Sequence, residues 1–354
     1  MPTARIPGRL PAGVRPTRYD VSLRVDPRRE RFEGTVSIAL AVEVPTRTIF
    51  LHALDIAAKR VVLKGAGGRS IPGTLARATA QGSEPDEGEV EISLSQEASA
   101  GAATLEIAYD APFNGQMAGL YRVKDRDDWY AFTQFEAADA RRCFPCFDEP
   151  SFKVPLRATV AVPDGMLAFS NGPEESRQTR DGWTTFTFLE TPPLPTYLVA
   201  FVAGALDVVQ YRGRCATPLR ALAARGKGEQ TELALRFSAE LLGVLEEYFG
   251  RPYPYAKLDI AALPEFSSGA MENAGLITFR EELLLGYERT ATRSRLRSMA
   301  NVIAHEISHQ WFGNLVTMRW WDDLWLNESF ATFMATIAMV GATRWTSYWT
   351  RFGT

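Results

Sequence analysis

Cysteine and histidine are scarce in this sequence of 354 residues, which contains three of each. Three cysteines are too few for the disulfide framework of a small secreted domain, even though two of them form Cys143-Phe-Pro-Cys146. A Cys-x-x-Cys sequence can be a redox pair or half of a zinc site, but no second pair is present to complete such a site. We therefore expect a structural role for these cysteines.

A large excess of charge of one sign and long hydrophobic runs are also missing. The 39 lysines and arginines nearly balance 42 aspartates and glutamates, and a net charge of -3 supplies no field to hold a nucleic acid or an anionic membrane. Residues 1–20 contain no apolar stretch of the kind found in signal peptides, and no later run is long enough to span a bilayer. We expect a soluble, cytoplasmic chain with no nucleic-acid or membrane partner, and the oligomeric state stays open.

Apolar residues make up 46% of the chain, which is long enough for two domains with cores of their own. From about Tyr19 to Val202 apolar and polar residues alternate, and turn sequences such as Pro163-Asp164-Gly165 interrupt the pattern. The alternation is clearest at Val36, Ile38, Leu40, Val42 and Val44, and again at Val90, Ile92 and Leu94. It predicts an N-terminal domain over residues 1–204 that is an antiparallel β-sandwich or saddle.

After Gly204 the apolar spacing changes to three and four residues, which is typical of helices. We predict a second, helical domain over residues 205–354, which together with the β domain makes the chain a multidomain α+β protein. Its expected elements are helices at Glu229–Phe249, Ser294–Asn314 and Asp322–Val340, and short strands at Leu258–Leu263 and Leu276–Arg280.

Two of the three histidines lie in the sequence His305-Glu306-Ile307-Ser308-His309. A spacing of four residues is just over one helical turn, so both imidazole rings project from one face and can share a metal ion. The opposite face is expected to anchor the helix in the core through an apolar stripe, namely Leu296, Met299, Ile303, Ile307 and Trp311. The alternative is a pair of hydrogen-bonded core histidines without a metal.

A catalytic zinc ion usually takes three protein ligands and a water molecule, so a third ligand is needed. Glu328 is the candidate, because a carboxylate beside an apolar helix face is costly unless a metal compensates it. In the helix that carries it, Asp322 or Asp323 can cap the first turn, and the expected packing face is Leu324, Trp325, Ala331 and Ala335. We predict one Zn²⁺ per chain, and an ordinary solvated glutamate is the alternative for Glu328.

Glu306 is not expected to bind the same ion, because the residue next to a ligand points about 100° away around the helix. It can instead reach the water on the metal. Zinc lowers the pKa of that water towards about 7, and a neighbouring carboxylate can take its proton as it attacks a carbonyl group. The pattern therefore favours hydrolysis of a peptide or an ester, with Glu306 as the catalytic residue.

Several longer motifs surround these residues. They are Thr133-Gln134-Phe135-Glu136, Asp139-Ala140-Arg141-Arg142, the run from Phe144 to Pro150, Gly269-Ala270-Met271-Glu272-Asn273, the run from His305 to Met318, and Trp325-Leu326-Asn327-Glu328-Ser329-Phe330. With these motifs the chain resembles the gluzincin aminopeptidases, the zinc family that includes the puromycin-sensitive aminopeptidase. The resemblance runs from Tyr19-Asp20 to the end of the chain.

The resemblance implies that residues 205–354 form the first part of a thermolysin-like zinc peptidase domain, incomplete at its C-terminal end. It also implies that the segment Gly269, Ala270, Met271, Glu272 and Asn273 lies along the substrate, with Glu272 binding the free α-amine. Glu136 matches the second amine anchor of the family, and Gln134 belongs to the same pocket wall. Without the resemblance, this small-residue segment with one charge is more typical of a plain surface turn.

The activity that follows is zinc-dependent hydrolysis of the first peptide bond of peptides with a free N-terminal amine. In the family a tyrosine further along the catalytic domain stabilises the oxyanion. Tyr348 is the only tyrosine after Glu328 and lies too close to that residue to match it. The alternative is a truncated, catalytically impaired form that binds zinc and peptide amines without efficient turnover.

Overall fold

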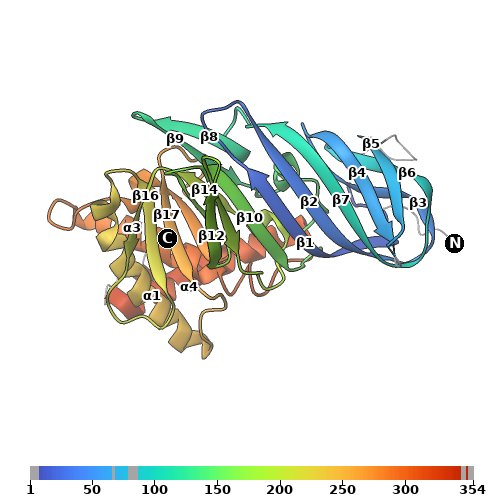
Figure 1. Cartoon of the computed structure of the whole chain (residues 1–354). Helices are drawn as coiled ribbons and strands as arrows, with labels where there is room; N and C mark the ends of the chain where they lie inside the picture. The colour runs from blue at the N-terminus through green and yellow to red at the C-terminus, as the bar shows by residue number, and fades with distance from the viewer. Residues whose placement is uncertain (1–7, 66–67, 79–86, 344–347, 350–354) are drawn as a thin grey trace.

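The computed structural model describes residues 8–65, 68–78, 87–343 and 348–349, which form three β-sheets and a group of helices (Figure 1). The first sheet has ten strands in the order β12 (Glu174–Arg180), β13 (Trp183–Phe188), β10 (Leu156–Pro163), β1 (Val14–Arg24), β2 (Arg31–Val42), β7 (Gly101–Pro112), β4 (Ala57–Gly65), β5 (Ser70–Arg77), β6 (Glu89–Ala98) and β3 (Thr46–His52). The second has four, β11 (Leu167–Ser170), β14 (Phe201–Gly204), β9 (Asp128–Gln134) and β8 (Gly119–Asp125).

The third sheet has five strands in the order β15 (Leu206–Gln210), β16 (Leu219–Ala224), β17 (Leu258–Leu263), β19 (Leu276–Arg280) and β18 (Ala270–Met271). The helices are α1 (Glu232–Phe249), α2 (Glu281–Leu284), α3 (Arg293–His309) and α4 (Leu324–Thr343), and the 3₁₀ turns are η1 (Ala140–Arg142), η2 (Thr196–Leu198), η3 (Gly228–Thr231) and η4 (Trp321–Asp323). The predicted mixed α+β class is therefore confirmed. The domain boundary at residue 204 stays a prediction.

The alternation of side chains explains how these layers stack. In β9 the side chain of Ala131 packs into the core of the first sheet, whereas its neighbours Tyr130 and Phe132 pack against the third sheet. In β17 the side chain of Ile260 packs against the helices, and Ala261 faces the second sheet. Because successive residues of a strand point to opposite faces, the second and third sheets are each buried on both sides.

The predicted period of two is confirmed in β2, where Val36, Ile38, Leu40 and Val42 are all buried. The prediction is wrong for Val44, which lies beyond the end of the strand and is 60% exposed. In the first sheet the strands β1 and β10 pair in parallel, which only a long connection between two strands allows. The other neighbouring strands of the first sheet pair antiparallel, as predicted.

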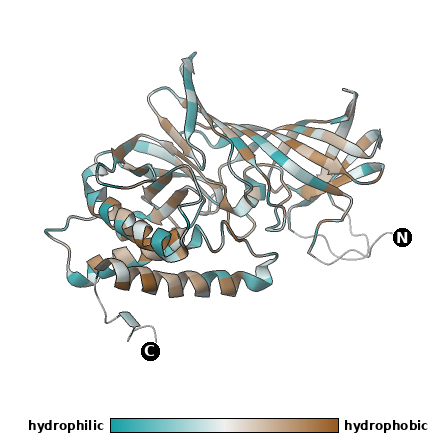
Figure 2. Cartoon of the chain, turned by 90° about the horizontal axis from the view of Figure 1, so that it is seen from below, coloured by the Kyte–Doolittle hydropathy of each residue, from teal (hydrophilic) through white to brown (hydrophobic). Residues whose placement is uncertain are grey.

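The helices cover the face of the third sheet that is turned away from the second sheet. Figure 2 shows them gathered at one end of the molecule, with the long strands of the first sheet at the other. The predicted apolar stripe of α3 is confirmed, since Met299, Ile303, Ile307 and Trp311 are buried and Leu296 packs against them. This packing leaves the other face of α3 free to carry polar side chains.

Several helix boundaries differ from the prediction. The helix expected from Glu229 begins at Glu232, because residues 228–231 form the 3₁₀ turn η3. The helix expected to reach Asn314 ends at His309, because the amides of Asn314, Leu315 and Val316 each bond the carbonyl five residues earlier and so form wider turns. The helix expected from Asp322 begins at Leu324, after a 3₁₀ turn that has no side-chain cap.

In α4 the predicted packing face holds for Ala331 and Ala335, which are buried, but is wrong for Trp325, which is 64% exposed. Asn327 in the same turn points inwards and is buried. Trp325 lies about 200° around the helix from Asn327, which turns its side chain outwards.

Cys143 and Cys146 are free thiols and completely buried. Burial raises the pKa of each thiol, so neither has the exposed, ionised character of a reactive cysteine. The hydroxyl group of Tyr109 donates a hydrogen bond of 2.8 Å to the carbonyl oxygen of Cys143. Both cysteines therefore serve as small core residues in the described structure.

Phe132 tests the stacking of the second sheet on the third. Its side chain is fully buried, with ring centroids 6.0 Å from Tyr121 and 5.9 Å from Tyr130. Replacing Phe132 by alanine should lower the free energy of unfolding by about 3–5 kcal/mol, because the cavity between two sheets cannot collapse easily. The control is Tyr248→Ala, at a position that is 53% exposed. Equal effects of the two substitutions in urea unfolding would contradict the described layering.

Candidate functional site

Residues from four separate elements meet at one cavity of about 360 Å³. His305, Glu306 and His309 come from the end of α3, and Glu328 from the start of α4. Glu272 follows directly after β18, and Glu136 lies two residues after β9. The lining consists of Glu136, Gly269, Ala270, Glu272, Asn301, Val302, His305, Glu306, His309 and Glu328.

The two histidines and Glu328 bring three donor atoms together. The Nε2 atoms of His305 and His309 are 2.9 Å apart, Nε2 of His305 is 3.2 Å from Oε2 of Glu328, and Nε2 of His309 is 3.6 Å from its Oε1. A tetrahedral zinc ion with bonds of about 2.0–2.1 Å holds neighbouring ligand atoms about 3.3 Å apart. The three residues therefore fit a zinc ion by the type and the spacing of their donor atoms.

The hydrogen bonds on the far sides of the rings support this orientation. Nδ1 of His309 lies 2.9 Å from Oδ1 of Asn327 and 3.1 Å from the carbonyl oxygen of Phe312. Both partners are acceptors, so Nδ1 carries the proton and Nε2 keeps its lone pair for a metal. Nδ1 of His305 is 3.5 Å from the hydroxyl group of Thr332.

Two other sets of side chains have ligand atoms within 4.8 Å of one another, Glu272 with Glu306 and His309, and Glu136 with Glu272 and Glu328. The set of His305, His309 and Glu328 is the one that supplies two imidazoles, and zinc favours nitrogen ligands. It is also the set whose second nitrogen atoms have acceptors of their own. The remaining carboxylates surround it.

This gathering of carboxylates changes several pKa values. Burial, followed by repulsion from Glu272 and Glu328, raises the pKa of Glu136 to about 8. Burial also raises the pKa of Glu306 well above its usual range, which His309 partly offsets and Glu272 reinforces. The pKa of Glu328 is lowered, chiefly by hydrogen bonds from the two histidines. The cavity is therefore built for positive charge.

The carbonyl oxygen of Glu272 is held by two buried side-chain amides that the sequence reasoning missed. Nε2 of Gln310 donates to it at 2.9 Å and Nδ2 of Asn314 at 2.7 Å. Nδ2 of Asn327 also lies 3.4 Å from the carboxylate of Glu272. The sequence does contain a sign of these roles. Gln310, Asn314 and Asn327 are polar residues next to large apolar ones, inside the motifs that carry the predicted zinc ligands.

The other residues predicted to bind substrate divide into two groups. Gly269 and Ala270 line the cavity, whereas Gln134, Met271 and Asn273 are buried outside its lining. Nε2 of Gln134 is 3.5 Å from the sulfur of Met271, and Nδ2 of Asn273 donates to Thr278 at 3.1 Å. These three side chains therefore support the strand from behind.

Tyr348 is also placed by the structure. Its side chain is buried, and its hydroxyl group donates to the carbonyl oxygen of Arg297 at 3.2 Å. Among the described residues that line the cavity there is no tyrosine.

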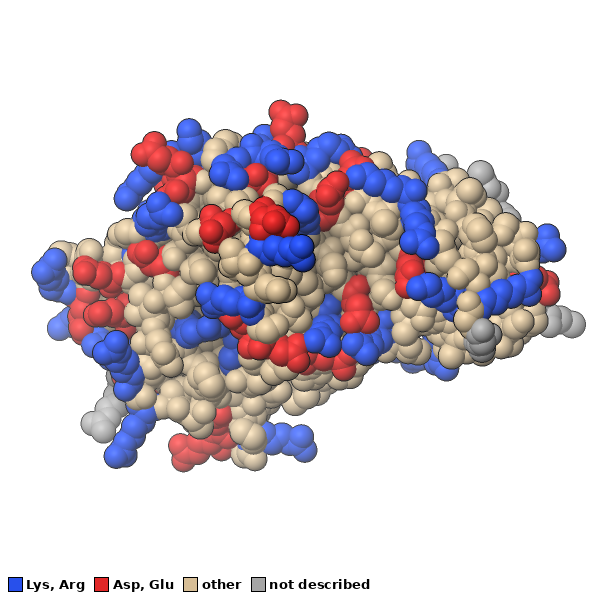
Figure 3. Space-filling model, in the orientation of Figure 1, with Lys and Arg blue, Asp and Glu red and all other residues tan. Residues whose placement is uncertain are grey.

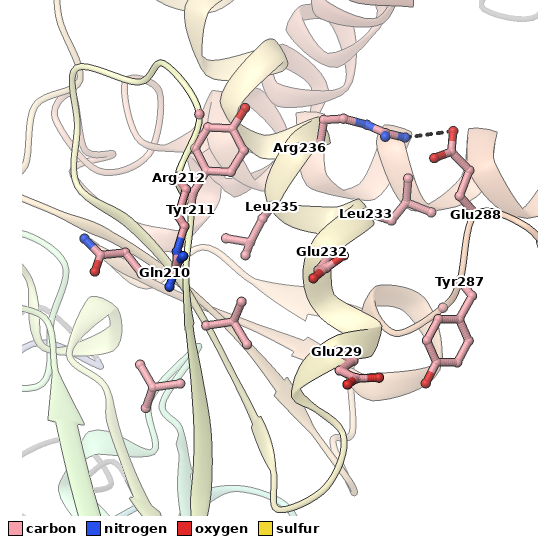
Figure 4. A pocket seen from close by; sticks show the side chains of 14 residues that line it. Gln210, Tyr211, Arg212, Glu229, Glu232, Leu233, Leu235, Arg236, Tyr287 and Glu288 are labelled. Carbon is pink, nitrogen blue, oxygen red and sulfur yellow. Dashed lines mark ion pairs between the residues drawn. The ribbon is translucent and has the colours of Figure 1, made fainter.

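A larger cavity of about 850 Å³ lies elsewhere, between β15, the start of α1 and the segment at residues 286–288 (Figure 4). Its lining includes the ion pair of Arg236 with Glu288, in which nitrogen and oxygen are 2.9 Å apart. The described lining contains no histidine or cysteine. The smaller cavity is therefore the better candidate for zinc chemistry.

Two family models match the sequence. The Peptidase M1 N-terminal domain matches residues 15–198, and the Peptidase family M1 domain matches residues 233–353. The second match contains His305, Glu306, His309 and Glu328, and the first contains Gln134 and Glu136.

Curated relatives agree with these matches. Aminopeptidase M1-D of Oryza sativa subsp. japonica is 40% identical over 97% of this chain and 39% of its own length. Aminopeptidase M1 of Arabidopsis thaliana is 38% identical, with the same two shares. Glutamyl aminopeptidase of Rattus norvegicus is 35% identical over 92% of this chain and 35% of its own length. The chain thus spans less than half the length of these relatives.

The stability of the metal-free protein should fall as the pH rises from about 5 to about 8. Glu136, with its pKa raised to about 8, keeps its proton in the folded chain over this range and loses it in the unfolded chain. The folded state then binds more protons, so its advantage decreases with rising pH. Urea unfolding in the presence of a chelator measures the effect.

Glu136→Gln should make this pH dependence less steep, because it removes one of the two carboxyl groups of the cavity whose pKa burial raises, the other being that of Glu306. Glu282→Gln, at an exposed position in α2, is the matched control and should leave it unchanged. A free energy of unfolding that rises over the same range, or an unchanged slope in Glu136→Gln, would contradict the placement of this carboxyl group.

Proposed function

The chain belongs to peptidase family M1, and on that premise we propose that it is a zinc-dependent aminopeptidase that hydrolyses the first peptide bond of peptides with a free N-terminal amine. One observation carries the proposal. Carboxylate oxygens of Glu136, Glu272 and Glu328 lie within 4.8 Å of one another, so a place for an amine adjoins the His305, His309 and Glu328 cluster.

In this proposal His305, His309 and Glu328 hold one Zn²⁺ per chain. Bound zinc polarises the carbonyl group of the scissile bond and lowers the pKa of a water molecule. Asn327 would keep the ring of His309 in the tautomer that a ligand needs, since its Oδ1 accepts from Nδ1.

Glu306 is the proposed catalytic residue. It lines the cavity between the two histidines but points to a different side of α3, so it can accept a proton without competing as a ligand. Burial raises the pKa of its carboxyl group, so the carboxylate binds a proton more readily than that of an exposed glutamate. Glu306 then passes the proton to the departing amine.

Glu272 and Glu136 are the proposed acceptors for the substrate amine. Their charge-assisted hydrogen bonds would fix the first residue at a set distance from the histidines, which places only the first peptide bond over the reacting atoms. Gly269 and Ala270, which line the cavity, let a substrate backbone approach closely, and Gln134, Met271 and Asn273 support the same strand.

The proposed partner is thus a peptide. On the face in Figure 3 basic and acidic side chains are interspersed, without a large patch of either sign. No helix among the described residues is long and apolar enough to cross a bilayer. The cytoplasmic location, like the absence of nucleic-acid and membrane partners, stays a prediction.

A second candidate function is binding of zinc and peptide amines without efficient turnover. It is favoured by the lining of the cavity, which offers no tyrosine among the described residues, and by the engagement of Tyr348 with Arg297. Loss of one oxyanion donor typically lowers the rate by about 10²–10³. An assay with chromogenic amino-acid amides separates the two functions, because only the first gives zinc-dependent release of the chromophore.

His309→Ala should lower the zinc affinity sharply, because it removes one of three protein ligands. His52→Gln is the matched control. His52 is the third histidine, buried far from α3 along the chain, and its Nδ1 accepts from the amide of Asp148. Metal analysis after dialysis should find about one zinc per chain in the original protein and in His52→Gln. Full zinc content in His309→Ala would sink the ligand assignment.

Glu306→Gln should nearly abolish turnover and leave the zinc content unchanged, since glutamine keeps the shape but accepts no proton. Turnover should therefore fall while the zinc content stays at about one per chain. A variant that loses zinc together with activity would show that Glu306 is a ligand or a structural residue.

A further inference from the structure

The turns that follow α3 carry one of the two side chains holding Glu272. The amides of Asn314, Leu315 and Val316 bond carbonyl oxygens back along the chain, the first of them that of His309. These turns therefore fix Asn314 relative to His309, and Asn314 in turn donates to the carbonyl oxygen of Glu272. Carbonyl groups at the end of such a helical segment point forward without partners of their own.

Lys153, from the connection between η1 and β10, supplies the missing donors. Its ammonium group donates to the carbonyl oxygen of Asn314 at 2.7 Å, to that of Leu315 at 2.8 Å and to the hydroxyl oxygen of Thr317 at 2.9 Å. All three protons of the ammonium are used. The hydroxyl group of Thr317 donates in turn to the carbonyl of Asn314 at 3.0 Å.

The environment of Lys153 favours this role over that of a surface cation. The part of the chain that the structure describes offers no carboxylate as an ion-pair partner for it, and burial lowers the pKa of its amine. Desolvating an ammonium is costly unless its hydrogen bonds are made. A cation at the negative end of a helical segment is favourable, and the turns after α3 provide that end.

We propose that Lys153 is a positioning residue, which ties the N-terminal β-rich part of the chain to the turns after α3 and so holds Asn314 and Glu272 in place. The role rests on the proposed function, because it matters for catalysis only if Glu272 binds the substrate amine. Lys153 is absent from the lining of the cavity, so it acts through Asn314.

A second contact, made by Asn171, also joins the N-terminal β-rich part of the chain to the segment around Glu272. Nδ2 of Asn171 donates to the carbonyl oxygens of Ala274 and Leu198, both at 2.8 Å. It thereby holds Ala274, the residue directly after the segment Gly269–Asn273. Glu272, two residues before Ala274, is held separately by the side-chain amides of Asn314 and Gln310. Without Lys153 the bonds from Asn171 to Ala274 and from Gln310 to Glu272 would remain, while the bond from Asn314 to Glu272 would loosen. A displacement of about 1 Å at such a group can cost about 10²-fold in rate.

The first test is hydrogen exchange in zinc-loaded protein, which needs no activity. Lys153→Met keeps the length of the side chain and removes its three donors, whereas Lys153→Arg keeps charge and donors. Lys64→Met is the matched control, because Lys64 pairs with Glu106 on the first sheet. In Lys153→Met we expect amide hydrogen exchange at residues 270–276 and 313–317 to be about tenfold faster than in the original protein. Lys64→Met should leave these rates unchanged, and Lys153→Arg should give rates between those of the original protein and Lys153→Met.

Unchanged exchange at residues 270–276 in Lys153→Met overturns the proposal, even if residues 313–317 respond. If that variant does not fold, Thr317→Val removes one acceptor of the lysine and should give a smaller change of the same kind. If Thr317→Val and the original protein then exchange at the same rate at residues 270–276, the proposal is overturned.

The second test is affinity for trialanine and for N-acetyltrialanine, measured in a Glu306→Gln background that leaves the peptide intact. Lys153→Met should lower the preference for the free amine about tenfold and leave the zinc content unchanged. Loss of affinity for both peptides alike would mean a general structural role and overturn the proposal. If the parent protein shows no preference for the free amine, the proposed function fails, and the exchange result still decides the link from Lys153 to Glu272.

Discussion

The crowding of carboxylates around His309 is the constraint on which the rest of the structure depends. Glu136, Glu272, Glu306 and Glu328 share one cavity with its ring, and burial raises the pKa of the carboxyl groups of Glu136 and Glu306. A zinc ion at the histidines and an amine between the carboxylates would remove this strain. The carboxyl groups that crowd the cavity are therefore those that the proposed reaction uses.

Holding such groups together needs a rigid surround, which the stacked sheets supply. Glu136 follows a strand of the second sheet, Glu272 follows the edge strand of the third, and α3 brings His309 on its polar face while its apolar stripe is buried. Buried amides then join these parts, since Gln310 and Asn314 both bond the carbonyl of Glu272. The site is thus assembled between layers rather than within one of them.

Features of the fold and site that depend on local sequence patterns could be predicted, whereas those that depend on distant contacts could not. The spacing of His305 and His309 on one helix face, and the period of two at Val36 to Val42, are local patterns that tertiary packing left unchanged. The parallel pairing of β1 with β10, the outward turn of Trp325 and the end of α3 at His309 depend on contacts distant in sequence. The roles of Asn314 and Lys153 need the fold itself, because their partners are far away along the chain.

The central claim is that Glu272 recognises the free amine of a peptide whose first bond lies at the metal. Affinity of the original protein and of Glu272→Gln for a free-amine peptide and its N-acetylated form completes a double-mutant cycle on this one contact. We predict a coupling of about 1.5–3 kcal/mol, as expected for a hydrogen bond to a charged group. If acetylation weakens binding as much in Glu272→Gln as in the original protein, another group holds the amine and the proposed recognition of the N-terminus is wrong.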